Sequence, residues 1–280
     1  MAIQRWVLLP DGTKVPALGQ GTWFMGESSS QQQQEISALK LGIEHGLTLI
    51  DTAEMYADGG AEIIVGKAIK GVRDKIFLVS KVLPSNASYQ KTLQACHNSL
   101  KRLQTDYLDM YLLHWRGSVP LTETFDALQT LVEQGKIKRW GVSNFDLDDL
   151  LEVESYVDQH QIMTNQVLYN LSRRGIEFDL LPWSRKKSLP IMAYSPIERG
   201  RILTHQALID MANQYQASPA QIALAWVLQK ENVVAIPKAS STTHVIDNIK
   251  SLNITLSAED LIILDKTFPV PKHKIPLEMH

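Results

Sequence analysis

Three ionisable side chains stand at the ends of consecutive apolar runs. Asp51 ends LTLID, Lys81 ends IFLVSK and His114 ends YLDMYLLH. Taken singly, each has a commoner structural explanation: a helix N-cap for the aspartate, a solvated chain for the lysine and a packed ring for the histidine. If the runs are neighbouring parallel strands, however, their carboxyl ends share one rim, and a carboxylate, an ammonium and an imidazole meet there. Together they favour a site for acid–base chemistry.

Helix-like stretches separate these runs, and the two patterns alternate along the chain. The strand-like runs are ALGQGT (17–22), LTLID (47–51), IFLVSK (76–81), YLDMYLLH (107–114), IKRWGVS (137–143), TNQVLY (164–169), PIMAYS (190–195) and VVAIPK (233–238). Stretches such as EISALKLGIEHG and TFDALQTLVEQG space their apolar residues as one face of a helix, and both end in a glycine suited to a C-cap, Gly46 and Gly135. This alternation predicts a parallel sheet with helices outside it.

Eight such units favour a closed barrel over an open doubly wound sheet. In 280 residues they give about 35 residues per unit, a natural length for one βα unit. The open sheet usually carries G-x-G-x-x-G after its first strand, whereas the glycines here stand at 19, 21 and 26. We therefore predict a single (β/α)8 TIM-barrel domain over 1–280, with an N-terminal β-hairpin around Pro10-Asp11-Gly12. The proline-rich tail after Phe268 is expected to be irregular.

The composition argues against several classes of function. A net charge of −2 argues against a nucleic-acid partner, and one cysteine, Cys96, excludes an intrachain disulfide. Neither a secretory signal nor a long apolar window is present, so we expect a cytoplasmic protein without membrane contact. The histidine spacing and the single cysteine offer no zinc site, and no P-loop or G-x-S-x-G elbow occurs. No metal is expected, and a monomer is the default expectation.

At the level of motifs, the chain resembles the aldo-keto reductases over nearly its whole length. GLTLIDTAEMYADGGAEIIVG (46–66) is similar to the first signature of that family, LVSKV (78–82) to its lysine strand and YLLHW (111–115) to its histidine strand. The resemblance runs from GQGTW (19–23) to IPKASSTTHVIDN (236–248), and the motifs occur in the right order. Within the family, the chain looks most similar to bacterial reductases of small aldehydes such as methylglyoxal.

The resemblance implies a catalytic quartet of Asp51, Tyr56, Lys81 and His114. Reducing a carbonyl requires a hydride at carbon and a proton at oxygen, and Tyr56 would supply the proton. Because a phenol has a pKa near 10, we expect the Lys81 ammonium to lower the pKa of Tyr56 toward neutrality. Asp51 would keep Lys81 charged and oriented. His114 would hydrogen-bond the carbonyl oxygen, orient the substrate and help to polarise it.

The same resemblance implies a nicotinamide dinucleotide across the barrel mouth. Ser143, Asn144 and Gln166 would hold its carboxamide, and Tyr194 would stack on the ring, although ordinary core roles for Gln166 and Tyr194 remain alternatives. Lys238 would contact phosphate, and Asp247 and Asn248 the adenine. The full set of expected cofactor contacts is Gly21, Thr22, Trp23, Asp51, Ser143, Asn144, Gln166, Tyr194, Ser195, Pro196, Ile197, Arg199, Ile236, Lys238, Ala239, Ser240, His244, Asp247 and Asn248.

Two departures from the family pattern bear on the choice of cofactor. Ala239 stands where many members have serine, and His244 where many have arginine. An arginine would grip a 2′-phosphate bidentately and stay charged, whereas a histidine is only partly charged near neutrality. Other side chains remain available to bind the 2′-phosphate, namely Lys238, Ser240, Ser241 and Thr242. For this reason NADPH is the expected cofactor, with NADH as the alternative.

A small-molecule carbonyl compound is the expected substrate. Trp23 and Trp115 would wall the pocket beside Tyr56 and His114, unless the two tryptophans serve only core packing. Leu83 replaces an aromatic residue of many relatives, and the loops 23–30 and 115–120 are short. Small or aromatic aldehydes and ketoaldehydes fit such a pocket.

Two alternatives from other classes stay open. One is a cofactor-binding regulatory subunit with little turnover, which the intact quartet weighs against. The other is a barrel lyase or isomerase that uses Lys81 as a Schiff-base nucleophile, which would leave the nicotinamide-site residues unexplained. Fold alone does not decide between them.

Overall fold

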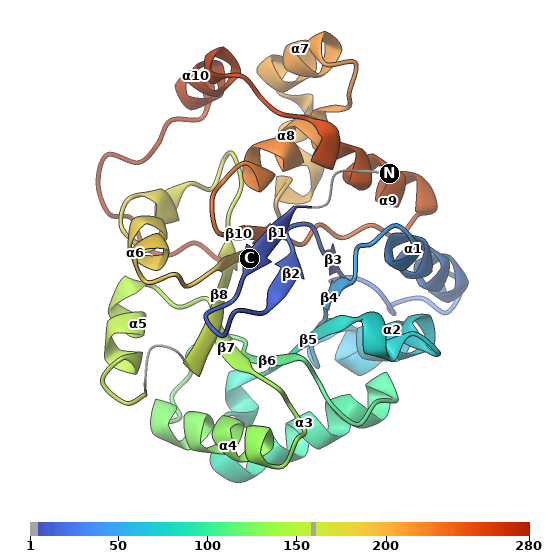
Figure 1. Ribbon diagram of the computed structural model, residues 1–280, viewed down its shortest axis with the longest axis vertical. Coiled ribbons are helices and arrows are strands. Elements are labelled where there is room, and N and C mark those ends of the chain that lie inside the picture. The colour runs from blue at the N-terminus through green and yellow to red at the C-terminus, as the bar shows by residue number, and fades with distance from the viewer. Residues whose placement is uncertain (1–4, 158–160) are drawn as a thin grey trace.

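The computed structural model describes residues 5–157 and 161–280, and a ring of parallel strands forms its centre (Figure 1). The strands are β3 (Gln20–Gly21), β4 (Leu49–Asp51), β5 (Phe77–Val82), β6 (Met110–Leu113), β7 (Trp140–Ser143), β8 (Ile162–Leu168), β9 (Ile191–Tyr194) and β10 (Val233–Ala235). They pair in chain order from β3 to β10, and each pairing is parallel. Parallel bridges Leu18–Ala235 and Gly21–Lys238 join the first strand to the last. The predicted (β/α)8 barrel is confirmed; residues 1–4 and 158–160 of the domain expected over 1–280 lie outside the described residues.

Helices surround the ring on its outer side (Figure 1). They are α1 (Gln32–Glu44), α2 (Gly60–Ile69), α3 (Tyr89–Leu103), α4 (Leu121–Glu133), α5 (Leu147–Val153), α6 (Leu180–Lys186), α7 (Gln206–Gln214), α8 (Pro219–Leu228), α9 (Thr242–Lys250) and α10 (Ala258–Thr267). The predicted caps are confirmed, since Gly46 (φ 90°) follows α1 and Gly135 (φ 66°) follows α4 in the left-handed region. None of the described helices has both the length and the apolar character needed to cross a membrane.

Burial explains why these segments take their places. Every residue of β8 is buried, as expected for a parallel strand that packs against side chains in the barrel and against helices outside it. Helix α3 buries Ala95, Cys96, Ser99 and Leu103, which lie on one face at helical spacing. The core is therefore continuous from the barrel interior to the inner faces of the helices, and it holds the strand ends in fixed positions.

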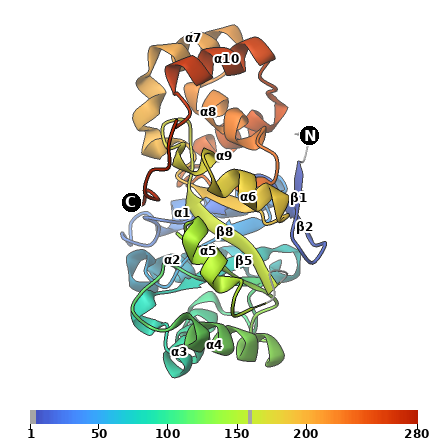
Figure 2. The ribbon, with the colours of Figure 1, turned by 90° about the vertical axis from the view of Figure 1, so that its left-hand side faces the viewer.

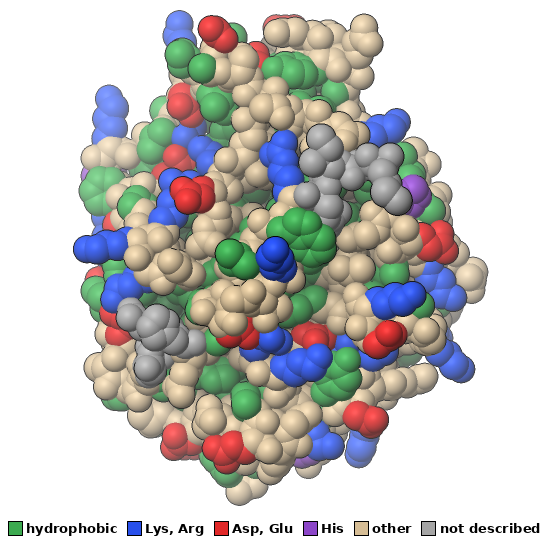
Figure 3. Space-filling view, in the orientation of Figure 1, with side chains coloured by type: hydrophobic (Ala, Val, Ile, Leu, Met, Phe, Trp, Pro, Cys, Tyr) green, Lys and Arg blue, Asp and Glu red, His purple; other side chains and the backbone are tan. Residues whose placement is uncertain are grey.

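The N-terminal hairpin and the C-terminal tail lie at opposite ends of the barrel (Figure 2). The predicted hairpin is present as β1 (Trp6–Leu8) and β2 (Lys14–Pro16), which pair antiparallel across one end of the barrel. Trp6 and Leu8 stay exposed there, and cationic and anionic side chains are interspersed over that face (Figure 3). The C-terminal tail after Phe268 has no helix or strand, as predicted, and it crosses the other end, where the strands finish.

Candidate active site

A cavity of about 720 Å³ opens at the carboxyl ends of the strands. Most of the residues expected from the sequence line it. These are Gly21, Thr22, Trp23, Asp51, Tyr56, His114, Trp115, Ser143, Asn144, Gln166, Tyr194, Ser195, Pro196, Ile197, Arg199, Ile236, Lys238, His244, Asp247 and Asn248. Ala239 and Ser240 are not among the lining residues. Neither is Lys81, which has no exposed surface and lies behind Asp51 and Tyr56.

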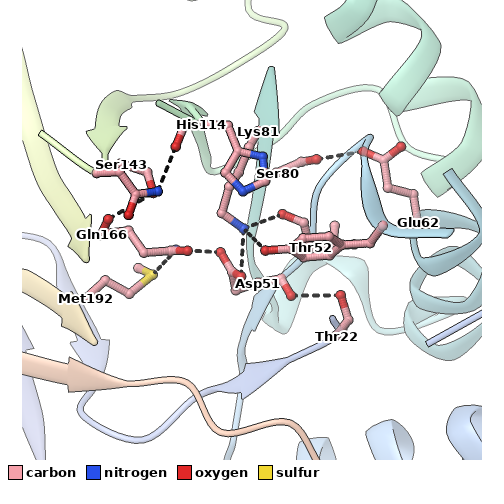
Figure 4. A network of polar contacts seen from close by, with 12 residues as sticks. Thr22, Asp51, Thr52, Glu62, Ser80, Lys81, His114, Ser143, Gln166 and Met192 are labelled. Carbon is pink, nitrogen blue, oxygen red and sulfur yellow. Dashed lines mark hydrogen bonds and ion pairs between the residues drawn. The ribbon is translucent and has the colours of Figure 1, made fainter. Parts of the chain in front are cut away.

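Lys81 is the centre of a buried polar network (Figure 4). Its Nζ donates to Asp51 Oδ2 at 2.8 Å, to the Thr52 carbonyl oxygen at 2.8 Å and to the Tyr56 hydroxyl oxygen at 3.1 Å. All three protons of the ammonium therefore have acceptors. The chain brings these groups together because β4 and β5 are neighbours in the sheet and Asp51 and Lys81 both point into the barrel near its mouth.

Tyr56 reaches the network through an unusual turn. It begins the 3₁₀ segment η1 (Tyr56–Gly59), and the next three residues, Ala57 (φ 51°), Asp58 (φ 51°) and Gly59 (φ 85°), all adopt the left-handed region. That conformation costs a residue with a Cβ roughly 1–2 kcal/mol. Such strain persists only where the surroundings over-determine it, and here it follows directly after the phenol that faces the cavity.

Burial controls the protonation of this network. It raises the pKa of Asp51 and lowers the pKa of Lys81, and their contact at 2.8 Å opposes both shifts. Burial, followed by the charge of Asp51, raises the pKa of Tyr56 well above 10.0. The expectation that Lys81 lowers the pKa of Tyr56 toward neutrality is therefore wrong in direction, because burial of the hydroxyl and the charge of Asp51 both act to raise that pKa. The phenol is held protonated.

His114 faces the same cavity as a neutral ring. Burial, with the charge of Lys81 as the second cause, lowers the pKa of His114 to about 2. Its edge lies against Tyr56, with ring centroids 5.8 Å apart. Nδ1 of His114 is buried and has no hydrogen-bond partner among the described residues. A neutral imidazole can donate one hydrogen bond to a carbonyl oxygen without bringing a charge into the cavity.

Amide and hydroxyl groups of β7 and β8 form the opposite wall. Gln166 Nε2 donates to Asp51 Oδ1 at 2.7 Å, and the Ser143 hydroxyl donates to the backbone carbonyl oxygen of Gln166 at 2.8 Å. Asn144 Nδ2 donates to the His114 carbonyl oxygen at 3.0 Å, and Asn144 Oδ1 accepts from the Tyr194 hydroxyl at 2.9 Å. These contacts tie the wall to the network around Lys81.

The far end of the cavity is formed by the segment after β10. Lys238 and His244 line it, and Ser241 caps α9 by accepting from the His244 backbone N–H at 3.3 Å. Asp247 is already bonded to neighbouring side chains, since its Oδ2 accepts from the Ser218 hydroxyl at 2.7 Å and its Oδ1 accepts from Gln221. The amino end of α9 and the two basic side chains favour an anion here.

The mouth contains residues that the sequence did not point to. One is His280, whose ring lies 6.0 Å from that of Trp23 and 6.2 Å from that of Tyr194. The expected Arg199 lies beside it, with its guanidinium 4.4 Å from the Trp23 ring centroid. Further lining residues that the sequence did not point to are Phe24, Met55, Gly200, Leu203, Ser218, Pro219, Ala220, Pro237 and Met279. Several of these adjoin expected residues in the sequence, but Met279 and His280 lie in the tail, where no periodicity or motif marks them.

Comparison with known proteins places this geometry in a family. The model of the Aldo/keto reductase family matches residues 17–268. The chain belongs to the aldo/keto reductase family. The resemblance seen in the motifs is confirmed, and so is the expectation of an oxidoreductase. No group of three or more His, Cys, Asp or Glu side chains within residues 5–157 and 161–280 is arranged to hold a metal ion.

Individual aldo/keto reductases are similar to this chain over nearly its full length. Methylglyoxal reductase YeaE of Escherichia coli (strain K12) is 51% identical and covers 99% of each chain. Glyoxal reductase of Bacillus subtilis (strain 168) is 35% identical over 94% of this chain and 93% of its own length. The crystal structure of an aldo/keto reductase from Klebsiella pneumoniae in complex with NADP and acetate superposes with a TM-score of 0.96, at 53% identity, over 99% of this chain and all of that chain.

Proposed function

We propose that this aldo/keto reductase uses NADPH to reduce small aldehydes and ketoaldehydes, methylglyoxal among them, to alcohols. One observation carries the proposal: Lys81 Nζ donates both to Asp51 Oδ2 and to the Tyr56 hydroxyl, at 2.8 and 3.1 Å, beside a cavity of about 720 Å³. The identity of 51% to the Escherichia coli methylglyoxal reductase supports the substrate class. The NADP complex of the Klebsiella pneumoniae enzyme supports the cofactor.

The cavity has the donor set that a nicotinamide dinucleotide requires. Ser143, Asn144 and Gln166 would hold the carboxamide, Tyr194 would stack on the ring and Lys238 would contact phosphate. Lys238 and His244 line the far end beside the amino end of α9, and this arrangement suits the negative charge of the cofactor's phosphates. NADPH, when bound, supplies the hydride.

The proton would come from Tyr56. Its raised pKa keeps the phenol protonated at neutral pH, so that it can donate as negative charge develops on the carbonyl oxygen. The phenolate that forms lies at hydrogen-bond distance from the Lys81 ammonium, which stabilises it in a buried site. Asp51 keeps the ammonium in place. Lys81 and Asp51 therefore stabilise the phenolate once the proton has been transferred, and they do not lower the pKa of Tyr56 before the transfer.

His114 would orient the substrate as a neutral hydrogen-bond donor. Because its pKa lies at about 2, it carries no charge at working pH and does not compete with Lys81 for Asp51. A donor fixed by packing against Tyr56 and Trp115 needs little reorganisation when the carbonyl oxygen becomes more negative. Trp23 and Trp115 would form the apolar walls of a pocket suited to small substrates.

Tyr56→Phe tests the proton donor. We expect kcat/KM for methylglyoxal, followed as NADPH oxidation, to fall by about 10²–10⁴-fold, with NADPH binding retained. Tyr156→Phe is the matched control, because Tyr156 is 51% exposed and does not line the cavity. Activity retained by Tyr56→Phe would remove the proposed donor, and NADPH binding by an inactive wild type would favour a regulatory subunit instead.

The contacts of Lys81 argue against a Schiff-base lyase. Its ammonium is fully buried, does not line the cavity and has three acceptors within 3.1 Å. A nucleophilic amine would have to lose a proton and leave all three acceptors to reach a substrate. Borohydride treatment in the presence of substrate should therefore leave the mass of the protein unchanged.

The monomeric state and the cytoplasmic location stay predictions. Sedimentation equilibrium of the purified protein would decide the first, and we expect a mass close to the 31.5 kDa of one chain. Fractionation of the producing cells would decide the second.

A further inference from the structure

Outside the cavity, a second buried carboxylate lies behind the catalytic strand. Glu62, in the first turn of α2, has no exposed surface. Its Oε1 accepts from the Ser80 hydroxyl at 2.6 Å, and its Oε2 accepts from Arg102 Nε of α3 at 2.5 Å. Figure 4 shows Glu62 reaching Ser80 from α2 while Lys81, the next residue of β5, reaches Asp51. A charge removed from water in this way needs hydrogen-bonded or charged partners. The partners of Glu62 are Ser80 and Arg102, and each of them contacts or belongs to a segment that carries a reacting group.

The link to Lys81 follows from strand geometry. Successive side chains of a strand point to opposite faces, so Ser80 points toward the helices and Lys81 into the barrel. The hydrogen bond from Ser80 to Glu62 therefore fixes, from outside, the part of β5 that presents the ammonium. A shift or rotation of this segment would move Lys81 Nζ relative to its three acceptors.

The link to Tyr56 passes through Arg102. The side chain of Arg102 lies directly under Gly59, where an added Cβ would come within 2.4 Å of Arg102 Cδ. Gly59 has φ 85° and ends the left-handed turn that begins after Tyr56. Because Glu62 holds Arg102 Nε, it also holds the side chain on which this turn rests. One carboxylate thus supports both the strand of Lys81 and the turn of Tyr56.

Charge connects Glu62 to the same groups. After burial and the two effects of Asp51, Glu62 is the next cause acting on the pKa of Lys81, and it raises that pKa. The groups that surround Glu62 are Arg102 and Cys96 of α3, Tyr111 of β6 and Ser80 of β5, while Lys81 points to the opposite face of β5. Arg102 is 26% exposed on its side chain and is the cation in direct contact with Glu62.

We propose that Glu62 is a positioning residue for the reduction: from the outer face of the barrel it fixes Lys81 through Ser80 and Tyr56 through Arg102. This inference rests on the proposed function, because it concerns the acid–base pair of that reaction. It assigns a role in the chemistry to a residue that touches neither substrate nor cofactor.

Glu62→Gln is the first test, because it keeps the shape of the side chain and removes its charge. We expect kcat for methylglyoxal to fall about tenfold or more, since small displacements of reacting groups have effects of this size, with KM and NADPH affinity within about twofold of wild type. The alkaline limb of the kcat–pH profile should move to lower pH, because Lys81 loses a charge that favours its ammonium form. A residue that serves only stability would lower Tm and leave the pH profile unchanged.

The matched control is Asp109→Asn. Asp109 is also a buried carboxylate that contacts an arginine, Arg73 Nη2 at 2.8 Å, and β5, through the Leu78 backbone N–H at 3.1 Å. It lies at the opposite end of the strand, away from Lys81. We expect Asp109→Asn to lower Tm while kcat and the pH profile stay as in the wild type. Equal effects of the two substitutions on kcat would overturn the proposal.

Two further measurements test the inference if Glu62→Gln does not fold or if the wild type is inactive. If Glu62→Gln does not fold, Ser80→Ala removes only the bond to β5, and a wild-type kcat in that variant would overturn the proposal. If the wild type reduces no aldehyde, the proposed function fails, but the effect of Glu62 on Lys81 can still be measured. The titration of the Lys81 Cε resonance is followed by ¹³C NMR, and the resonance is assigned by its loss in Lys81→Met. A lower titration midpoint in Glu62→Gln supports the inference, and an unchanged midpoint contradicts it.

Discussion

Gln166 Nε2 lies 2.7 Å from Asp51 Oδ1, so the wall expected to hold the cofactor's carboxamide also holds the carboxylate that orients Lys81. Each oxygen of Asp51 has its own donor, Gln166 on one side and Lys81 on the other. The two residues come from β8 and β4, on opposite sides of the ring. This bond crosses the barrel and couples the cofactor wall to the acid–base pair.

Replacing Gln166 with Met should therefore affect both binding and chemistry. Methionine keeps the length of the side chain but removes the donor to Asp51, and the loss of a hydrogen bond to a buried charge costs about 1.5–3 kcal/mol. We expect Kd for NADPH to rise. We also expect kcat to fall about tenfold or more, because a free-energy cost of that size changes a rate by at least that factor. Fluorescence titration with NADPH and steady-state assays measure the two effects. A change in Kd alone would show that the bond to Asp51 has no part in the chemistry.

The buried neutral state of His114 predicts a pH dependence of stability. Its pKa is about 2 in the folded protein and 6.5 as an ordinary value, so between these pH values the unfolded chain binds a proton that the folded protein does not. Stability is therefore lost as the pH falls below 6.5, by about 2 kcal/mol between pH 7 and pH 5. Urea denaturation of the wild type and of His114→Asn at both pH values isolates this contribution. Identical losses in the two proteins would contradict it.

The positions of three quartet members and of the barrel strands could be predicted because they depend on local pattern. Asp51, Lys81 and His114 end apolar runs, and parallel strands bring such ends to one rim whatever the details of packing. Tyr56 directly precedes a left-handed turn that no propensity favours, and only the resemblance to the family pointed to it. The bond between Gln166 and Asp51 joins residues 115 positions apart, and no sequence period relates them.

The direction of the pKa shift of Tyr56 could not be predicted for a different reason. The residue types alone place an ammonium beside a phenol, which lowers a pKa, but the degree of burial and the position of Asp51 decide the sign. Met279 and His280 were missed because the tail that carries them is irregular. Ion pairs with distant residues, such as Lys274 with Asp148 and Glu278 with Arg173, hold that tail in place.

His244 predicts a weak preference for NADPH that arginine would strengthen. It lines the far end of the cavity with Lys238, and an imidazole cannot give a 2′-phosphate the two parallel hydrogen bonds of a guanidinium. For His244→Arg we expect the ratio of kcat/KM with NADPH to that with NADH to rise about tenfold, because a bidentate, charge-assisted contact is added. His45→Arg, an exposed change outside the cavity, is the control for net charge. An unchanged ratio in His244→Arg would mean that the 2′-phosphate binds elsewhere.

The tail predicts a change in substrate binding without a change in chemistry. Glu278 pairs with Arg173, and the next two residues, Met279 and His280, line the cavity. Glu278→Ala should loosen them and raise KM for the aldehyde, while kcat stays near wild type because the network around Lys81 is untouched. The pair is about one-third exposed on both sides, so it contributes about 1 kcal/mol or less, and the rise in KM should be about fivefold at most. Lys274→Ala, which removes the contact with Asp148 farther from the cavity, should raise KM less. A fall in kcat with constant KM would place the tail in the chemical step rather than in binding.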